Sequence, residues 1–462
     1  MKKRFSGQLA VMIVSVGLAW QAPARAQKFS VLYNFGTHAG DPEAAEYEGI
    51  VAQGRDGNLY STTVFGGASG FGAVFKITAR GTLTVLHSFD STTEANPLSG
   101  LTLGTDGDFY GTTTHGGTFN MGTVFKVRTN GVLTVLYNFT GGSGANPYGP
   151  PIECTDGNFY GTTDGGGTNG LGTVYKLTPL GELTMLYSFD NTHGRDPVTP
   201  LVQGTNGNLY GTTSLGGTNN DGVIFSISQS GKFTVLYNFD GTHGAQPFGP
   251  LVQGSDGNFY GTTLLGGAVN FGAIFKMTAA GKLTVLHSMN GTTDGGMPDA
   301  GLVQGTDGNF YGANADAATG GSGTIFRISP TTPYRYKVLY NFNGTTGGLP
   351  EVTLLLHTDG ILYADTQSGG TAGWGTFYGL NIGLKPFVSL VSPSGKIGKT
   401  IGILGQGFKG TMGVSFNGTP ASFKVVSTTY LTAKVPGGAT SGFVTVTTPK
   451  GKLTSNKKFR IN

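Results

Sequence analysis

Three histidines in this sequence share a short pattern that suits ligand binding. His38, His193 and His243 each follow a threonine and stand four positions before a proline, and Asp41 and Asp196 directly precede two of those prolines. An imidazole and a carboxylate on one loop offer a donor and an acceptor to a polar ligand. Capping of the local turn is the alternative explanation. Four of the seven equivalent loops lack a histidine, so a shared ring of ligand contacts is incomplete.

Carboxylates in comparable connections raise the possibility of a second chemistry, general acid–base catalysis. Asp164, Asp221, Asp299 and Asp316 are the residues concerned, since a pair of carboxyl groups at a suitable separation cleaves glycosidic bonds. The sequence does not determine whether any two of them approach each other. The chain also lacks a Gly-x-Ser-x-Gly elbow, a His-Glu-x-x-His motif and a phosphate loop. We therefore assign no catalytic residue.

Asp-Gly-Asn turns recur along the chain and invite a test for calcium, which prefers oxygen ligands in loops. One copy has Asn206 in place of the aspartate, which keeps the hairpin turn but loses the charge. We therefore interpret these turns as structural and expect no metal and no cofactor. The single cysteine, Cys154, stands where other copies have glycine, which favours a small tolerated residue over a nucleophile.

The motifs belong to a sevenfold internal repeat. Asp-Gly-(Asn/Asp)-(Phe/Leu)-Tyr and its variants begin at positions 56, 106, 156, 206, 256, 307 and 359, and a Gly-x-(Val/Ile)-(Phe/Tyr) motif follows each of them. Each repeat reads as four short strands; in the fifth these are residues 251–254, 258–263, 272–278 and 282–289. Four antiparallel strands in about 50 residues is the pattern of a β-propeller blade.

The two ends of the array predict how it closes. The last repeat lacks a fourth strand, while an unattached copy of that strand, residues 29–35, stands before the first repeat. Pairing of this segment with residues 375–380 would remove two exposed sheet edges. The predicted fold is all-β: a seven-bladed propeller over residues 27–384, closed by the N-terminal strand. An immunoglobulin-like β-sandwich over residues 385–462 follows, because short alternating strands and turn signals replace the repeat there.

Charge divides unevenly between these two predicted domains. Residues 386–462 contain ten lysines and arginines and no acidic residue, whereas residues 27–385 contain 15 basic and 25 acidic residues. Such asymmetry points to an electrostatic partner. The two domains could attract each other, or the basic domain could bind an anionic polymer outside the cell; the sequence leaves both open.

Two families are similar to these segments. The tail carries Ser-Pro-Ser-Gly at 392–395, Gly-Gln-Gly-Phe at 405–408 and Val-Ser-Phe-Asn-Gly at 414–418, and it resembles an IPT/TIG domain. The repeats, with Gly-Thr-Thr at 111–113 and Gly-Thr-Val-Phe-Lys at 122–126, resemble the GloVer tandem repeats of exported bacterial proteins. That resemblance implies export and propeller-like repeats, and it implies no activity and no catalytic residue.

The first 26 residues predict export. A basic start, 12 apolar residues over 9–20 and Ala-Arg-Ala at 24–26 form a signal peptide, with cleavage expected after Ala26. The apolar run is too short to span a bilayer, so we expect no membrane-spanning segment in the mature protein. We expect a secreted or cell-surface protein and no nucleic-acid partner.

Loop lengths select the face on which function is expected. In the predicted strand order, the two longer loops of every repeat lie at one end of the propeller and only tight turns lie at the other. Binding residues belong on loops held by a rigid scaffold. We therefore expect a non-enzymatic binding or adhesion protein that recognises a glycan or a protein through the long-loop face. A carbohydrate-active lyase or hydrolase with its site on the same face is the alternative.

Overall fold

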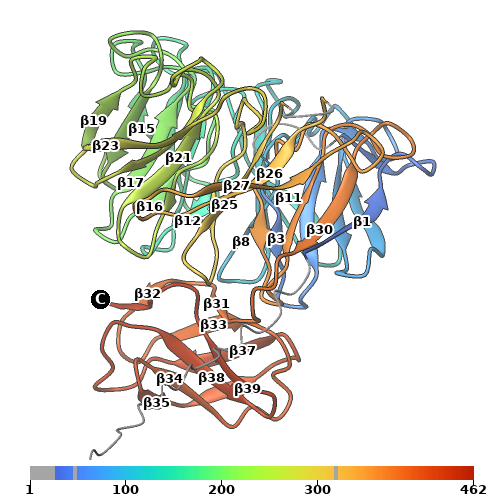
Figure 1. The fold of residues 1–462 in the computed structure, drawn as a ribbon, viewed down its shortest axis with the longest axis vertical. Coiled ribbons are helices and arrows are strands. Elements are labelled where there is room, and N and C mark those ends of the chain that lie inside the picture. The colour runs from blue at the N-terminus through green and yellow to red at the C-terminus, as the bar shows by residue number, and fades with distance from the viewer. Residues whose placement is uncertain (1–26, 45–48, 317–320) are drawn as a thin grey trace, which may run out of the picture.

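The computed structural model describes residues 27–44, 49–316 and 321–462, and all of their regular structure is β-strand. The predicted signal peptide, residues 1–26, lies outside the described residues. Among the residues described, none belongs to a helix long and apolar enough to cross a bilayer. Figure 1 shows the repeats as a group of small sheets, with a separate C-terminal unit against one end of that group.

The repeats form seven four-stranded antiparallel sheets within the described residues. In hydrogen-bonded order they are β3 (Ala52–Gln53), β4 (Leu59–Thr63), β6 (Ala73–Ile77), β7 (Leu83–Ser88); β8 (Thr102–Leu103), β9 (Phe109–Thr113), β10 (Thr123–Val127), β11 (Leu133–Asn138); β12 (Ile152–Glu153), β13 (Phe159–Thr163), β14 (Thr173–Leu177), β15 (Leu183–Ser188); β16 (Val202–Gln203), β17 (Leu209–Thr213), β18 (Val223–Ile227), β19 (Phe233–Asn238); β20 (Val252–Gln253), β21 (Phe259–Thr263), β22 (Ala273–Met277), β23 (Leu283–Ser288); β24 (Val303–Gln304), β25 (Phe310–Asn314), β26 (Thr324–Ile328), β27 (Tyr336–Asn341); and β28 (Leu355–Leu356), β29 (Leu362–Asp365), β30 (Thr376–Asn381), β1 (Lys28–Asn34). A further pair, β2 (Pro42–Glu43) and β5 (Phe65–Gly66), lies in loops of the first repeat.

Burial explains why each strand has its composition. The second strand of each repeat is buried at every position, and aromatic and β-branched residues fill both of its sides. The fourth strand is only partly buried and its second position is exposed, as expected for an outer strand. The first strand has only two residues, shorter than the four that the sequence predicts for the fifth repeat.

The N-terminal strand completes the last sheet, as predicted. β1 pairs antiparallel with β30, from Lys28 opposite Asn381 to Asn34 opposite Thr376, with a bulge in the same place as in the other sheets. The Phe29 ring stacks on Tyr340 of the preceding sheet with 3.7 Å between ring centroids, and Phe35 is fully buried. Residues more than 300 positions apart in sequence therefore share one core.

The first repeat contacts both the second and the seventh repeat. Ile50 forms parallel bridges with Gly100 of the second repeat and with Thr353 of the seventh. The Gln53 amide donates to the Thr358 hydroxyl at 2.8 Å, a contact that spans 305 positions. These contacts hold the first and last repeats side by side.

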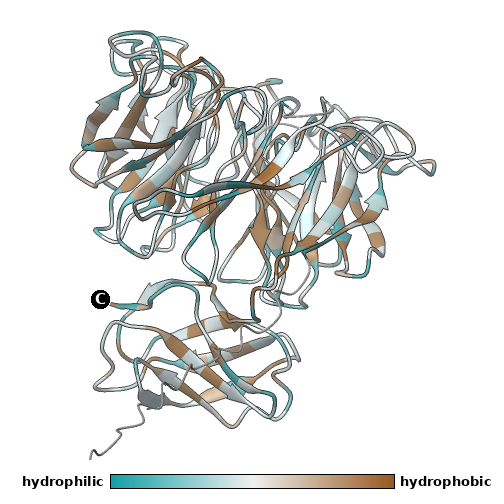
Figure 2. Ribbon diagram, in the orientation of Figure 1, coloured by the Kyte–Doolittle hydropathy of each residue, from teal (hydrophilic) through white to brown (hydrophobic). Residues whose placement is uncertain are grey.

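The C-terminal unit is a β-sandwich with its own core. One sheet contains β31 (Ser389–Leu390), β33 (Thr400–Leu404), β37 (Tyr430–Lys434) and β36 (Phe423–Val425); the other contains β35 (Thr419–Ala421), β34 (Gly413–Phe416), β38 (Val444–Thr448) and β39 (Gly451–Thr454); β32 (Ser394–Gly395) pairs with β40 (Arg460–Ile461). Apolar residues of both sheets, including Ile403, Phe416 and Val446, form the core between them. Figure 2 shows the corresponding alternation of hydrophobic and hydrophilic residues along these strands.

The sandwich packs against the tight-turn end of the repeats (Figure 1). The Thr429 hydroxyl donates to the Arg55 carbonyl at 2.8 Å, and the Arg55 guanidinium lies 4.7 Å from the centre of the Tyr430 ring. Gly57 fits closely against Thr429, whose methyl carbon would lie 2.7 Å from an added Cβ. The end of the array for which the sequence predicted only turns is therefore an interdomain contact.

Candidate functional site

The same backbone hydrogen bond recurs in the loops at the end of the repeats far from the sandwich. In every repeat, the residue just before the glycine that opens the third strand accepts a hydrogen bond through its carbonyl, at 2.9–3.3 Å. The donor is a residue of the next inter-repeat loop with φ between 47° and 55°. The acceptors, which we call the pre-glycine positions, are Phe71, Met121, Leu171, Asp221, Phe271, Ser322 and Trp374. Because the backbone at each position is fixed by this bond, its side chain is presented in a defined place.

Exposed apolar side chains gather on these loops in three adjacent repeats. The seventh, first and second repeats contribute five of them, which we call the apolar arc: Trp374 (43% exposed), Phe65 (40%), Phe71 (38%), Phe119 (55%) and Met121 (37%). Trp374 lies directly over Gly36, where an added Cβ would come within van der Waals overlap of the indole ring. A glycine at this position therefore lets the indole lie against the chain.

Each predicted histidine lies on this face but is bonded within its own loop. His193 Nδ1 is 2.8 Å from Asp190 and His243 Nδ1 is 2.8 Å from Asp240, while His38 Nδ1 is 3.3 Å from Asp41. The backbone N–H of each histidine also donates to the same carboxylate, which caps the turn. These loops enter the first, fourth and fifth sheets, so they do not form one cluster. The His38 side chain is 75% exposed and lies on the repeat that carries Phe65 and Phe71.

The two predicted aspartates have structural contacts in the loops. Asp41 is 8% exposed and accepts hydrogen bonds from the Tyr33 hydroxyl at 2.9 Å and from the His38 N–H at 2.8 Å. Asp196 has a φ of 55°, a value that aspartate tolerates better than most residues. Its N–H donates to the carbonyl of Leu171, one of the pre-glycine positions. Its carboxylate pairs with Arg195 at 2.7 Å. Ligand binding by these residues stays a prediction, because turn structure alone accounts for their contacts.

The carboxylates that suggested acid–base chemistry lie in the loops of several repeats. Burial, and then the negative charge of Asp196, raise the pKa of Asp164 to about 6. Burial and the charge of Asp240 raise the pKa of Asp221, and burial alone raises the pKa of Asp299 to about 7. The backbone of Asp316 bridges to Gly296. Asp164, a candidate for acid–base chemistry, therefore lies near Asp196, which the sequence analysis selected as a candidate ligand contact.

The Asp-Gly-Asn turns satisfy their carboxylates internally. Asp256 accepts hydrogen bonds from the Asn258 N–H and side-chain amide and from the Tyr260 hydroxyl. In the variant turn, the Asn206 amide donates to Tyr210 instead, at 2.8 Å, and the hairpin is unchanged. No group of three or more His, Cys, Asp or Glu side chains among the described residues is arranged to hold a metal ion. Cys154 is buried, and burial raises the pKa of its thiol, which disfavours a reactive thiolate.

Comparison with protein families decides what the repeats are. The model of the Gloeobacter/Verrucomicrobia repeat matches residues 16–125, 46–254, 99–306 and 248–412. The chain belongs to this repeat family. The IPT/TIG domain model matches residues 386–461, so the sandwich is a TIG domain, as its motifs predicted. No curated protein matches the sequence.

Solved structures match this Gloeobacter/Verrucomicrobia repeat protein at low identity and with TM-scores below 0.5. The periplasmic gluconolactonase of Pseudomonas aeruginosa is 15% identical, with a TM-score of 0.45, over 70% of this chain and 97% of that one. A structural-genomics protein of unknown function from Bacteroides thetaiotaomicron is 13% identical, with a TM-score of 0.43, over 77% and 76%. A chain of the mitotic checkpoint complex is 9% identical, with a TM-score of 0.47, over 82% and 98%.

The apolar arc was not predicted by the sequence analysis. Its signal was present, because Phe71, Met121 and Trp374 occupy the same position relative to the third-strand glycine. Their exposure was not evident, since apolar residues beside strands are usually buried.

Proposed function

We propose that this chain is an exported, non-enzymatic binding or adhesion protein whose seven sheets form a closed seven-bladed β-propeller. The pairing of β1 with β30 and the contacts of Ile50 with both neighbouring repeats support closure. The predicted signal peptide supports a place outside the cell. The ligand is a glycan or a surface protein, held on the long-loop face.

The apolar arc is the observation that carries this proposal. Exposed aromatic side chains are costly in water unless a partner covers them, and grouped exposed apolar residues mark binding surfaces. Tryptophan and phenylalanine offer large contact area with few rotatable bonds, so little entropy is lost on binding. His38, next to the arc on the first repeat, adds a polar group that can orient a ligand. The backbone bonds of the pre-glycine positions fix the backbone of three arc residues, Phe71, Met121 and Trp374, before binding.

A glycan array and a bacterial-surface pull-down with residues 27–462 test the proposal. Trp374→Ala and Phe119→Ala should each weaken binding at least ~10-fold, because large aromatic anchors dominate such interfaces. Leu180→Ala is the matched control, since Leu180 is 89% exposed in a tight turn away from the arc. Equal binding by all three variants would contradict a long-loop site.

The enzymatic alternative rests on Asp164 and Asp196. A carboxyl group with a pKa near 6 can act as a general acid near neutral pH. If the protein cleaves polysaccharides, Asp164→Asn should abolish turnover while binding persists. An absence of any turnover by the wild-type protein in a polysaccharide screen would eliminate this alternative.

A further inference from the structure

The basic residues of the TIG domain do not hold it to the repeats. Within the described residues, none of its ten lysines and arginines forms an ion pair with a carboxylate of the propeller-like region. Other contacts hold it there: Gln406 donates to the Thr358 hydroxyl at 3.0 Å, Thr429 donates to the Arg55 carbonyl, and the Arg55 guanidinium lies over the Tyr430 ring. The positive charge is therefore available to another partner.

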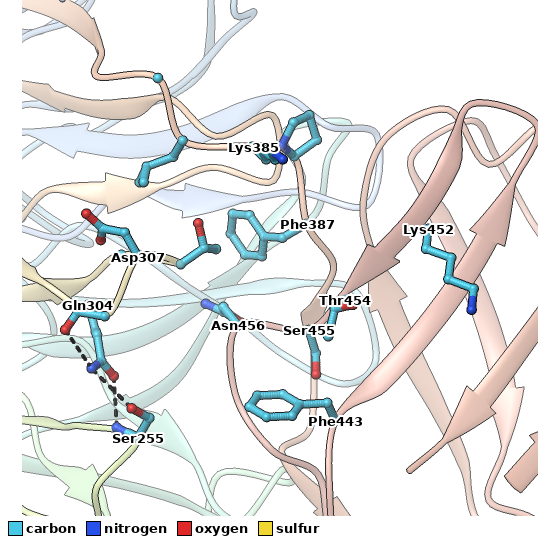
Figure 3. Close-up of a pocket in the computed structure, with 16 residues that line it drawn as sticks. Ser255, Gln304, Asp307, Lys385, Phe387, Phe443, Lys452, Thr454, Ser455 and Asn456 are labelled. Carbon is cyan, nitrogen blue, oxygen red and sulfur yellow. Dashed lines mark hydrogen bonds between the residues drawn. The ribbon is translucent and has the colours of Figure 1, made fainter. Parts of the chain in front are cut away.

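A large cavity opens between the two domains. Its volume is about 600 Å³, and it is lined by the fifth and sixth repeats, the linker at residues 383–387 and the TIG domain. Figure 3 shows Phe387 and Asn456 facing Gln304 and Asp307 across this space, with Phe443 nearby and Lys452 at the edge. Phe443 is 39% exposed, so its ring is accessible from the cavity.

A second cavity adjoins the first and is strongly basic. It has a volume of about 190 Å³, shares Ser255 with the first cavity, and is lined by Lys457, Lys458 and Arg460. Gln203 and Gln253 of the repeats form part of its other wall. The chain runs continuously past both cavities, because residues 454–456 line the first and residues 457–458 the second.

These cations lack counterions. Lys385, Lys457, Lys458 and Arg460 form no ion pair with any described residue. Among the lining residues of both cavities, the one carboxylate is Asp307, whose oxygens already accept hydrogen bonds from Asn309 and Tyr311. The Lys457 and Lys458 side chains are exposed to solvent. Like charges gathered in one place without acidic neighbours favour a bound anion.

The remaining lining groups suit a sugar. Phe443 offers an exposed apolar ring surface against which the C–H face of a pyranose can lie, and Lys458 lies 5.8 Å from the centre of that ring. Gln304, Asn456 and Ser255 can exchange hydrogen bonds with hydroxyl groups. A few oriented polar groups beside apolar walls are typical of small-ligand sites.

We propose that the two adjoining cavities form a binding site for an acidic oligosaccharide, with its carboxylates on Lys457, Lys458 and Arg460 and a sugar ring on Phe443. The site is independent of the apolar arc and lies at the opposite end of the repeats. Both domains contribute to it, so the ligand would also fasten them together.

Titration calorimetry of residues 27–462 with tetragalacturonate at low salt tests the proposal. Lys457→Gln, Lys458→Gln and Arg460→Gln combined should weaken binding at least ~10-fold, because charge-assisted hydrogen bonds are lost. The matched control combines Lys396→Gln, Lys409→Gln and Lys424→Gln, which remove the same charge from exposed residues of the same domain that line neither cavity. Equal weakening by both triple variants, or no binding by the wild type, would overturn the proposal.

Three further measurements separate a saccharide site from general attraction. Phe443→Ala should weaken tetragalacturonate binding several-fold and leave the weak binding of a single-stranded oligonucleotide of equal charge unchanged. Equal affinity for that oligonucleotide in the wild type would refute saccharide recognition. If the cavity triple variant fails to fold, ligand protection of Lys457 against acetylation, with Lys424 unprotected, provides the test, and absence of protection counts against the site. Trp374→Ala should leave all these results unchanged, so failure of the long-loop proposal is distinguishable.

Discussion

One buried carboxylate, that of Asp365, departs from the residue pattern that the repeats share. Asp365 stands where the first five repeats have a threonine in the second strand, for example Thr162, and it is fully buried. Neither of its side-chain oxygens has a hydrogen-bond partner. A charged carboxylate is costly there, so burial raises the pKa of Asp365 to about 8.

Asp365 should make stability depend on pH. The folded protein keeps this carboxyl group protonated up to about pH 8, while the unfolded chain releases the proton above about pH 4. Stability is therefore present below pH 4 and is lost as pH rises toward 8, by ~1.4 kcal/mol per pH unit. Asp365→Asn should raise the melting temperature at pH 8 and change it little at pH 4, as measured by calorimetry. A gain that is the same at both pH values would show that this carboxyl group does not titrate as inferred.

The turn aspartates should behave as caps. Asp256→Asn should cost less than ~1 kcal/mol of unfolding free energy, because Asn206 already forms the same hairpin and the ion pair with Lys276 is partly exposed. Asp256→Ala should cost about 1–3 kcal/mol, since the Tyr260 hydroxyl loses its acceptor. Chemical denaturation measures both. Calorimetric uptake of calcium that Asp256→Asn abolishes would instead assign these turns to metal binding.

At the scale of elements, β1 connects the two ends of the array. It pairs with β30 along its whole length, and it places Phe29 and Phe35 in the core shared by the first and last repeats. β1 is distant in sequence from β30, and its loss would expose the hydrogen-bonding edge of β30.

Deletion of residues 27–36 should lower the melting temperature sharply. Loss of the buried Phe35 side chain alone should cost about 3–5 kcal/mol, and the unpaired β30 edge should promote association. Differential scanning calorimetry and size-exclusion chromatography measure these effects against the chain that starts at residue 27. An unchanged melting curve would mean that the array is not closed by this strand.

At the scale of the whole molecule, the two domains have opposite charge, but no ion pair between described residues joins them. Salt shortens the Debye length from about 10 Å at 0.1 M to about 3 Å at 1 M, so an electrostatically docked TIG domain would be released. We expect the radius of gyration from X-ray scattering to stay constant between these salt concentrations. Gln406→Ala combined with Thr429→Val provides the contrast, since loss of two docking hydrogen bonds should increase it. Expansion of the wild type in 1 M salt would restore internal attraction as the role of the basic domain.

The sequence by itself determined the repeats, their four-strand pattern, the place of β1 and the TIG domain. These follow from local signals: the Asp-Gly turns, the recurring strand motif seen at Phe159–Thr163, and the absence of a fourth strand after the last repeat. Local signals of this kind survive in a linear pattern, because turns and strand periods involve neighbouring residues. The histidine pattern was equally visible, but the same residues serve turn capping, so the sequence could not decide their role.

Only the tertiary structure decided where the apolar arc and the interdomain cavities lie. The exposure of Trp374, Phe71 and Phe119 depends on which loops lie side by side in the fold. The cavities beside Lys457 and Phe443 exist because the TIG domain packs on the tight-turn end, through contacts such as Thr429 with Arg55 that span 374 positions. Such contacts leave no periodic trace in the sequence, because packing between domains depends on the shape and chemistry of surfaces built from distant segments.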